Sequence, residues 1–465
     1  MIKRNVAYNF IYQVFTYIIP LVTTPYLSRV LGASGVGEYS FAYSVVSYFS
    51  LFAVLGLANY GNREISRVSH IDGKRKKTFW EIYSMQFLTG LIAFMAYNIY
   101  AFCLTKPTLI KSVMAIYLLS SVFDISWFYF GMELFKVTIL RNTILKIISC
   151  ILIFALVKGD GDAWIYGSII SISGLLSQVV LWLHIGQYVG RPIISLRGIK
   201  NRIVPNVKLF VPVIAVSIYK IMDKIMLGIY SNNQQVGFYE SSERLISIPV
   251  CFVTALGTVM LPRVSNMISK GEKDEAQILT EKSLIISIVS SSLIAFGMLG
   301  VLDEFIPLFF GSGYEECKSI LMLLLPSTIF VAQANVIRTQ ILIPYGQDNI
   351  YITAVVFGAV SNLLSNIIFI PKFGAVGASI GTLLSEIMVW LLQNIFVAKH
   401  VKPFSAFIKS LPVILLGVVM MRVIDTLKIG IDSLIVIIVV KAAIGFAVFV
   451  TPLIMYFVFI NRRKA

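Results

Sequence analysis

The sequence is poor in charged residues, cysteine and histidine, and each scarcity excludes a class of protein. Charged residues make up only 13% of the 465 residues, whereas 57% are hydrophobic and the mean hydropathy is +0.84. Because a soluble domain carries roughly a quarter charged residues, the composition indicates a protein that folds in lipid. The three histidines are scattered at positions 70, 184 and 400, so they predict neither a metal site nor a catalytic triad.

Motifs of enzymes are also missing. The four cysteines, at 103, 150, 251 and 317, lack the spacing of metal ligands or of a disulfide framework, and we expect them to be small hydrophobic side chains. The DGD at 160–162 lies in a short gap and is interpreted as a turn, and GKRKKT at 73–78 lacks a glycine-rich phosphate loop. We therefore predict no catalytic residue, no metal and no cofactor, and we do not expect an enzyme.

The sequence instead contains about fourteen long apolar runs. About 20 apolar residues in a helix cross a bilayer core of roughly 30 Å, and the runs lack the period of two that is typical of barrel strands. The predicted fold class is all-α, a polytopic integral membrane protein with about fourteen transmembrane helices. The runs are 6–31, 39–60, 79–104, 109–130, 137–157, 163–187, 204–230, 236–261, 283–301, 318–343, 350–370, 375–397, 407–424 and 433–460.

The positive charge is distributed according to membrane topology. The formal net charge is +16, but the gaps between runs are too short to hold a folded domain, so we expect no nucleic-acid partner. Lys and Arg gather in alternate gaps, in 62–77, 190–202 and the two termini, whereas 158–162, 231–235 and 311–316 are neutral or acidic. By the positive-inside rule, both termini are predicted to face the cytoplasm.

Short sequence echoes divide the chain into two similar halves. VGEY at 36–39 returns as VGFY at 236–239, Arg63 corresponds to Arg263, and LLSQVVLW at 175–182 resembles LLSEIMVW at 383–390. Six predicted spans separate the copies, which indicates a parallel repeat of the kind that builds transporters from two bundles. The predicted domains are an N-lobe at 1–190, a C-lobe at 191–400, and two further helices with a basic tail at 401–465.

Ionisable residues inside the predicted spans form the candidate site. A charge at the centre of a span costs at least about 2.5 kcal/mol, so each needs a partner or a wet cavity. The residues of the seventh and eighth spans fit either an ion-paired clamp or a cavity lining. The candidates for substrate binding are Arg29, Arg141, Lys220, Asp223, Lys224 and Arg338, and those for ion pairing or coupling are Asp124, Glu240, Glu243 and Arg244.

Several segments resemble a known family. TPYLSRVLGASGVGEYSFA, FDISWFYFGMELFK, YKIMDKIMLGIY, VGFYESSERL and IPKFGAVGASIGTLLSE are similar to the Wzx-type oligosaccharide flippases, in the polysaccharide-transporter branch of the multidrug/oligosaccharidyl-lipid/polysaccharide exporter superfamily. The resemblance implies two six-helix lobes around a cationic cavity, plus two C-terminal helices. It also implies alternating-access flipping of oligosaccharide units linked to undecaprenyl pyrophosphate, for surface polysaccharide biosynthesis.

The resemblance also implies partners of the protein, and two alternative functions stay open beside it. Membrane lipid and the lipid-linked oligosaccharide are the expected partners, with a polysaccharide polymerase and a chain-length regulator as further candidates. H⁺ and Na⁺ both stay open as coupling ions. A cation-coupled multidrug exporter would need an acidic pocket, whereas the excess within the spans is basic. A membrane glycan polymerase or ligase typically has a large outer loop with catalytic arginines, and the gaps of this chain are short.

The predicted topology can be tested with reporter fusions. Because Lys and Arg mark the inner gaps, fusions at Ser69 and Asn266 should report a cytoplasmic location, and fusions at Gly161 and Ser312 an external one. Paired phosphatase and fluorescent-protein reporters measure this directly. An external signal at Ser69 would overturn the whole topology, because every later span depends on it.

Overall fold

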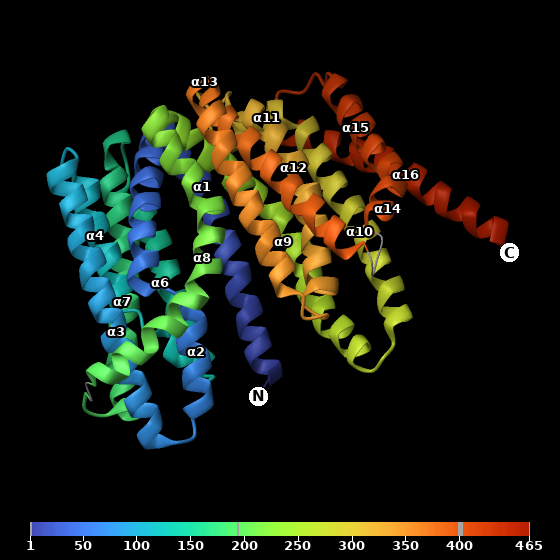
Figure 1. Ribbon diagram of the computed structural model, residues 1–465. Helices are drawn as coiled ribbons and strands as arrows, with labels where there is room; N and C mark the ends of the chain where they lie inside the picture. The colour runs from blue at the N-terminus through green and yellow to red at the C-terminus, as the bar shows by residue number, and fades with distance from the viewer. Residues whose placement is uncertain (1, 193–194, 399–402, 465) are drawn as a thin grey trace. The chain divides into compact units, whose positions relative to one another are not determined.

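The computed structural model describes residues 2–192, 195–398 and 403–464, and all the regular secondary structure of these residues is helical, as predicted (Figure 1). The α-helices are α1 (Ile2–Val54), α2 (Leu57–Val68), α3 (Asp72–Asn98), α4 (Leu109–Val122), α5 (Ser126–Gly131), α6 (Phe135–Leu156), α7 (Ala163–Val189), α8 (Leu196–Tyr230), α9 (Asn233–Ser269), α10 (Lys273–Gly300), α11 (Leu302–Phe309), α12 (Cys317–Ile337), α13 (Asp348–Val397), α14 (Pro403–Lys409), α15 (Leu411–Thr426) and α16 (Leu434–Lys464). Short π- or 3₁₀-helical segments are η1 (Ile99–Leu104), η2 (Asp160–Asp162) and η3 (Arg338–Leu342).

The long apolar helices make this a multi-pass membrane protein. Among the described residues, 10 helical segments are long and apolar enough to cross a membrane, or 11 if the bent pair α14 and α15 forms one span. Two of the segments are far longer than one crossing, at 51 and 50 residues, and each contains a sharp bend. The observed helices are therefore compatible with about fourteen spans.

Glycine makes both bends. Gly32 in α1 has φ 64° and Gly374 in α13 has φ 55°, in the left-handed region that costs a residue with a side chain extra energy. Gly377, just after the second bend, packs against the backbone of Phe369 and Ile370, so the two arms of α13 run back along each other. Each bend thus turns one long helix into two antiparallel spans.

The chain folds as two compact units, Met1–Gly237 and Phe238–Ala465. In unit 1, α1 packs against α3, α4, α6 and α7, and α4 also packs along α7 (Figure 1). The helix α8, which the sequence analysis places at the start of the second lobe, packs against α1, α2 and α3 of unit 1. The predicted lobe boundaries stay a prediction. In unit 2, α10 packs against α12 and α15, and α12 packs against α13.

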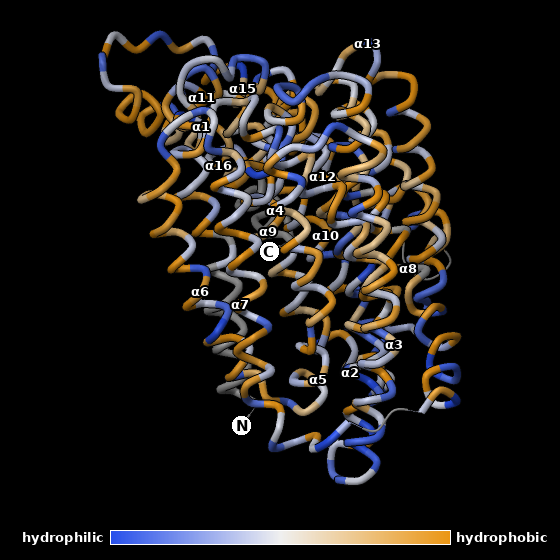
Figure 2. The backbone as a smooth tube through the Cα atoms, turned by 90° about the vertical axis from the view of Figure 1, so that its left-hand side faces the viewer, coloured by the Kyte–Doolittle hydropathy of each residue, from blue (hydrophilic) through white to orange (hydrophobic). Residues whose placement is uncertain are grey.

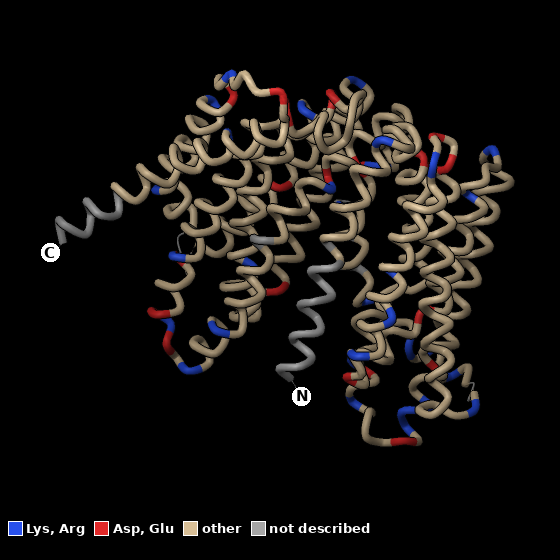
Figure 3. Tube along the Cα trace, turned by 180° about the vertical axis from the view of Figure 1, so that it is seen from behind, with Lys and Arg blue, Asp and Glu red and all other residues tan. Residues whose placement is uncertain are grey.

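The two ends of unit 1 are defined by contacts between distant segments. The Nε atom of Arg75 lies 3.2 Å from the carbonyl oxygen of Tyr188, which places the start of α3 beside the end of α7. At the other end, the Tyr26 hydroxyl donates to the carbonyl oxygen of Val157 at 2.6 Å. Hydrophobic residues run along the helices (Figure 2), and many of the Lys and Arg residues lie near helix ends (Figure 3). The basic gaps 62–77 and 190–202 of the sequence belong to the first of these two ends, which is the predicted cytoplasmic end.

The glycines of the two VG-x-Y motifs, Gly37 and Gly237, lie at a close backbone contact within unit 1. A Cβ atom on Gly37 of α1 would overlap the backbone carbonyl of Asn233 at the start of α9. A Cβ atom on Gly237 would overlap the carbonyl of Ala33. Glycine at these two positions therefore allows the two backbones to approach more closely than any side chain would permit.

Replacing Gly237 with Ala should destabilise the protein by roughly 1–3 kcal/mol, because the new methyl group overlaps backbone that cannot rotate away. Gly186→Ala in α7 is the matched control, since a Cβ atom there has no neighbour within 4 Å. It should leave stability unchanged or raise it slightly. Thermal unfolding of the purified protein measures both effects, and equal melting temperatures for the two variants would contradict the close packing.

Candidate functional site

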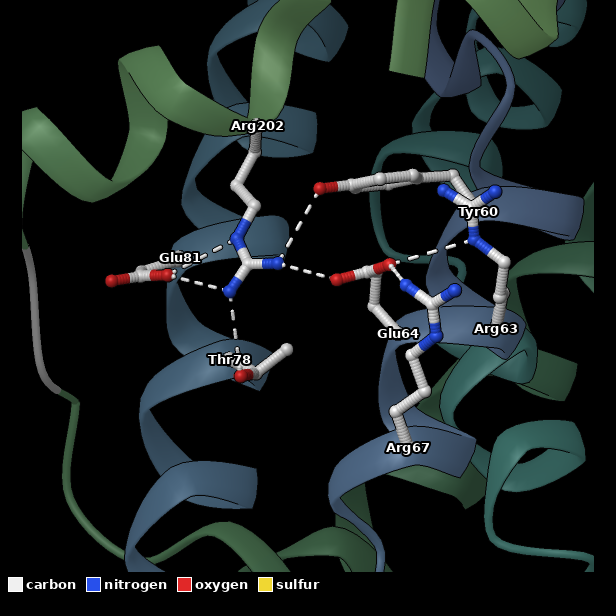
Figure 4. Close-up of polar contacts among 7 residues, drawn as sticks. All are labelled: Tyr60, Arg63, Glu64, Arg67, Thr78, Glu81 and Arg202. Carbon is white, nitrogen blue, oxygen red and sulfur yellow. Dashed lines mark hydrogen bonds and ion pairs between the residues drawn. The ribbon is translucent and has the colours of Figure 1, made fainter. Parts of the chain in front are cut away.

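A cluster of charged side chains joins α2, α3 and α8 at the predicted cytoplasmic end of unit 1 (Figure 4). On α2, Tyr60, Arg63, Glu64 and Arg67 follow the i, i+3, i+4, i+7 spacing that places side chains on one face of a helix. The opposite face buries apolar side chains, including Ile65, which is 0% exposed. The amphipathic sequence of α2 therefore presents its charges toward α3 and α8.

Arg202 of α8 is the centre of the cluster. Its Nη1 atom lies 2.8 Å from Oε2 of Glu64, and its Nη2 and Nε atoms lie 3.1 and 3.2 Å from Oε2 of Glu81. The same guanidinium lies 3.4 Å from the Tyr60 hydroxyl and 3.5 Å from the Thr78 hydroxyl (Figure 4). One side chain of α8 thus binds groups of both α2 and α3.

Because the charged groups of this network are largely buried, each of them needs a partner of opposite charge. The side chains of Glu81, Glu64 and Arg202 are 6%, 17% and 21% exposed. Removing one partner from a buried ion pair leaves an uncompensated charge, and the energetic cost of that charge exceeds the net gain from the pair. Arg202 is therefore a structural residue that holds α2 and α3 against α8.

Two further guanidinium groups stay accessible beside this network. Arg63 and Arg67 each contact Oε1 of Glu64 through a single nitrogen, at 3.5 and 3.1 Å, and their side chains are 46% and 65% exposed. They line a cavity of about 390 Å³ together with Glu81, Asn201 and Arg202. Three guanidinium groups face two carboxylates here, so the cavity carries a net positive charge and can bind an anion.

The predicted site residues of unit 1 are spread over several elements. Arg29 is exposed on α1, and its Nη1 atom lies 3.4 Å from the carbonyl oxygen of Pro25. Arg141 of α6 is 8% exposed and donates to the carbonyl oxygen of Ser177 in α7 at 2.6 Å. Asp124 accepts hydrogen bonds from the backbone amide and the hydroxyl of Ser126, at 2.8 and 2.6 Å, at the start of α5. These contacts join helices or shape a turn, and the predicted roles in binding stay predictions.

The predicted charges on α8 differ in exposure. Lys220 is exposed, Lys224 is half-buried and Asp223 is only 3% exposed. All three belong to unit 1. Their spacing on one helix agrees with the predicted shared face, and their role in a cavity or a clamp stays a prediction.

The predicted site residues of unit 2 make local contacts. Within α9, Nε of Arg244 lies 2.8 Å from Oε1 of Glu240, one helical turn away. Glu243, on the same helix, is half-buried. The guanidinium of Arg338 lies 4.8 Å from the ring centroid of Tyr351, in a cation–π arrangement. The clamp predicted between Lys224 and Glu243 would join the two units and stays a prediction.

The Arg202 cluster is not among the sites predicted from the sequence. In the sequence, Arg63 is noted only as the counterpart of Arg263 and as a cation of an inner gap, Arg202 only as a cation of another inner gap, and Glu64 and Glu81 are not among the candidates. Two signals were present in the sequence. One is the shared helical face of Arg63, Glu64 and Arg67, and the other is Glu81, a carboxylate inside the apolar run that begins at residue 79.

Solved structures with the same fold are membrane transporters. The chain is similar to the structure of "Lipid II flippase MurJ, inward closed conformation", with a TM-score of 0.76 and 16% identity over 97% of this chain and 100% of that one. An inward-facing multidrug resistance transporter of the MATE family has a TM-score of 0.50 and 12% identity, over 89% of this chain and 100% of that one. At these identities the similarity defines the class of fold.

Sequence comparison defines the family. The family described as "Polysaccharide biosynthesis protein" matches residues 2–268, which is more than half of the chain. A protein of Escherichia coli (strain K12), provisionally named an O-antigen transporter, is 23% identical over 408 residues, covering 86% of this chain and 97% of its own. One of Haloferax volcanii, provisionally named the low-salt glycan biosynthesis flippase Agl15, is 31% identical over 36% of this chain and 35% of its own. The chain belongs to the polysaccharide biosynthesis protein family, which confirms the resemblance to Wzx-type flippases.

Replacing Arg202 with Met should lower the thermal stability of the protein, because Glu64 and Glu81 would lose their shared counter-ion. Breaking a buried pair costs about 3–5 kcal/mol, and we expect a smaller loss here because Arg202 is partly exposed. Adding Glu81→Gln to Arg202→Met should restore part of the loss, since it removes the more buried carboxylate. Arg197→Met, at an exposed position of α8, is the control. If Arg202→Met melts at the same temperature as this control, the network does not stabilise unit 1.

Proposed function

We propose that this protein flips an oligosaccharide linked to undecaprenyl pyrophosphate from the inner to the outer leaflet of the bacterial cytoplasmic membrane by alternating access. The observation that carries the proposal is the pair of accessible guanidinium groups, Arg63 and Arg67, in a cationic cavity of a chain that belongs to this family. Its predicted cytoplasmic position is where a substrate made inside the cell would first be bound.

The geometry of the cavity suits a pyrophosphate group. A guanidinium donates two parallel hydrogen bonds to phosphate oxygens, a geometry that an ammonium group cannot provide. Arg63 and Arg67 have only one contact each with Glu64, so a doubly charged phosphate can compete for both. Arg202 would continue to neutralise Glu64 and Glu81 when the two outer arginines turn to the substrate.

The two rival functions fit this cavity less well. A multidrug exporter that takes cationic drugs needs acidic groups facing its cavity, whereas both carboxylates here are occupied by Arg202. A glycan polymerase or ligase typically has a large outer loop with catalytic arginines, and the gaps between the apolar runs are short. The proposed transport can be coupled to H⁺ or to Na⁺. A polysaccharide polymerase and a chain-length regulator are the partners that would use the flipped unit.

Removing the charges of Arg63 and Arg67 tests the proposal. The double variant Arg63→Gln, Arg67→Gln should reduce export of surface polysaccharide at least tenfold at normal protein abundance, because the phosphate loses both forked donors. Lipid-linked oligosaccharide should accumulate on the inner leaflet, as it should in a deletion strain. Lys200→Gln, an exposed cation of α8 outside the cavity, should export normally. A deletion strain without any accumulated lipid-linked sugar would refute the function itself.

A further inference from the structure

A second cavity lies at the opposite end of unit 1, beside the point where the two VG-x-Y motifs meet. Gly56 of the connection after α1 packs on Asn206 near the start of α8, whereas Gly37 packs on Asn233 just beyond the end of α8, so these segments run antiparallel. The cavity has a volume of about 190 Å³ and lies at the Gly37 end. It is named here the outer pocket, and its defining residues are Glu38, Phe41, Tyr97, Tyr100, Thr108 and Asn233.

Aromatic rings with fixed positions form the apolar walls of the outer pocket. Tyr97 is 1% exposed, and its hydroxyl donates to the carbonyl oxygen of Lys111 at 2.8 Å. The ring of Phe49 holds both tyrosines, with centroid distances of 5.3 Å to Tyr97 and 6.0 Å to Tyr100. Tyr100 belongs to the π-helical segment η1, a widened turn of a type that often occurs at functional sites. The walls are therefore preformed.

Polar groups without protein partners complete the outer pocket. In the described part of the chain, no hydrogen bond or ion pair engages the side-chain oxygens of Glu38, Tyr100 or Thr108, or the amide of Asn233. One carboxylate, one amide and two hydroxyl groups can thus both donate to and accept from a ligand. A small set of converging polar groups on an apolar pocket is the usual form of a small-molecule site.

The charge pattern excludes two other ligand classes. The lining holds one carboxylate, Glu38, and one ammonium group, Lys111, so it carries no net charge that would attract an anion. A cation would compete with Lys111, whose ammonium group already lies 6.0 Å from the ring centroid of Tyr100 and donates to Thr105 Oγ1 at 2.9 Å and to the carbonyl oxygen of Lys106 at 2.7 Å. A neutral ligand with many hydroxyl groups fits both the aromatic walls and the polar rim.

The volume of the outer pocket sets the size of this ligand. A protein cavity of about 150 Å³ can hold benzene, so 190 Å³ accommodates one six-membered ring but not a whole oligosaccharide. A pyranose ring presents apolar C–H groups on its faces and hydroxyl groups around its edge. Its faces match the tyrosine rings, and its hydroxyl groups match Glu38 and Asn233.

We propose that the outer pocket binds one sugar ring of the glycan carried by the substrate. The proposal rests on the proposed function, because it is the flipped glycan that supplies this ring at the outer face. The pocket is separate from the cavity of Arg63 and Arg67. That cavity would bind the charged phosphate groups and would not distinguish one sugar from another. The outer pocket therefore contributes recognition of the glycan itself.

Binding of the free glycan tests the outer pocket separately from transport. The glycan is released by mild acid from the lipid-linked oligosaccharide that accumulates in the deletion strain, and its binding to the full-length purified protein is measured by isothermal titration. Tyr100→Ala, which removes a wall, and Glu38→Gln, which removes an acceptor, should each weaken binding at least tenfold. Tyr100→Phe should retain most of the affinity, since the ring remains.

A neighbouring position supplies the control. Ile99 precedes Tyr100 in η1, is 54% exposed and does not line the pocket, so Ile99→Ala should bind the glycan as the unaltered protein does. Unchanged affinity in Tyr100→Ala and Glu38→Gln, or equal loss in Ile99→Ala, would overturn the outer pocket as a sugar site. The proposed function would survive that result if Arg63→Gln, Arg67→Gln still blocks export. Absence of accumulated lipid-linked sugar would end both proposals.

Discussion

Backbone amides and carbonyls inside the hydrocarbon core of a membrane have no water to bind, so each must find its partner within the chain. A chain that is 57% hydrophobic satisfies this requirement by forming long helices. The same requirement limits where the helices can change direction. The reversals within α1 and α13 occur at Gly32 and Gly374, whose positive φ angles a residue with a side chain adopts only with strain. The antiparallel helix pairs of both units follow from this.

Buried charged groups, like buried backbone groups, need partners within the chain, and the Arg202 cluster provides them. Glu81 lies in an apolar run, and it is tolerated there because Arg202 of α8 binds it together with Glu64. Because Arg202 binds both carboxylates, Arg63 and Arg67 at the edge of the network each contact only one carboxylate oxygen, Oε1 of Glu64. The binding capacity of the cavity is therefore a by-product of how the buried charges are neutralised. Glu64 contacts one nitrogen of each arginine, and the rest of both guanidinium groups stays accessible to an anion.

The internal repeat has a structural consequence beyond symmetry. Gly37 and Gly237, from the two copies of one motif, allow α1 and the start of α9 to touch through their backbones. This contact brings Glu38 and Asn233, which are far apart in the sequence, to one cavity beside the tyrosines of α3 and η1. Unit 1 thus carries two cavities with different chemistry, one cationic and one aromatic and polar. A substrate with a charged and a sugar part presents chemistry for each.

The all-helical membrane fold was determined by composition and by the length of the apolar runs, because the cost of exposing backbone to lipid leaves few alternatives. The resemblance to the flippases likewise lay in contiguous segments, and the family comparison confirmed it. The Arg202 cluster and the outer pocket could not be found this way. Glu64, Glu81 and Arg202 lie up to 138 residues apart, and their pairing depends on which faces of α2, α3 and α8 meet. Side-chain packing decides that, and a linear pattern of hydrophobic residues carries no information about which helix becomes the neighbour of which.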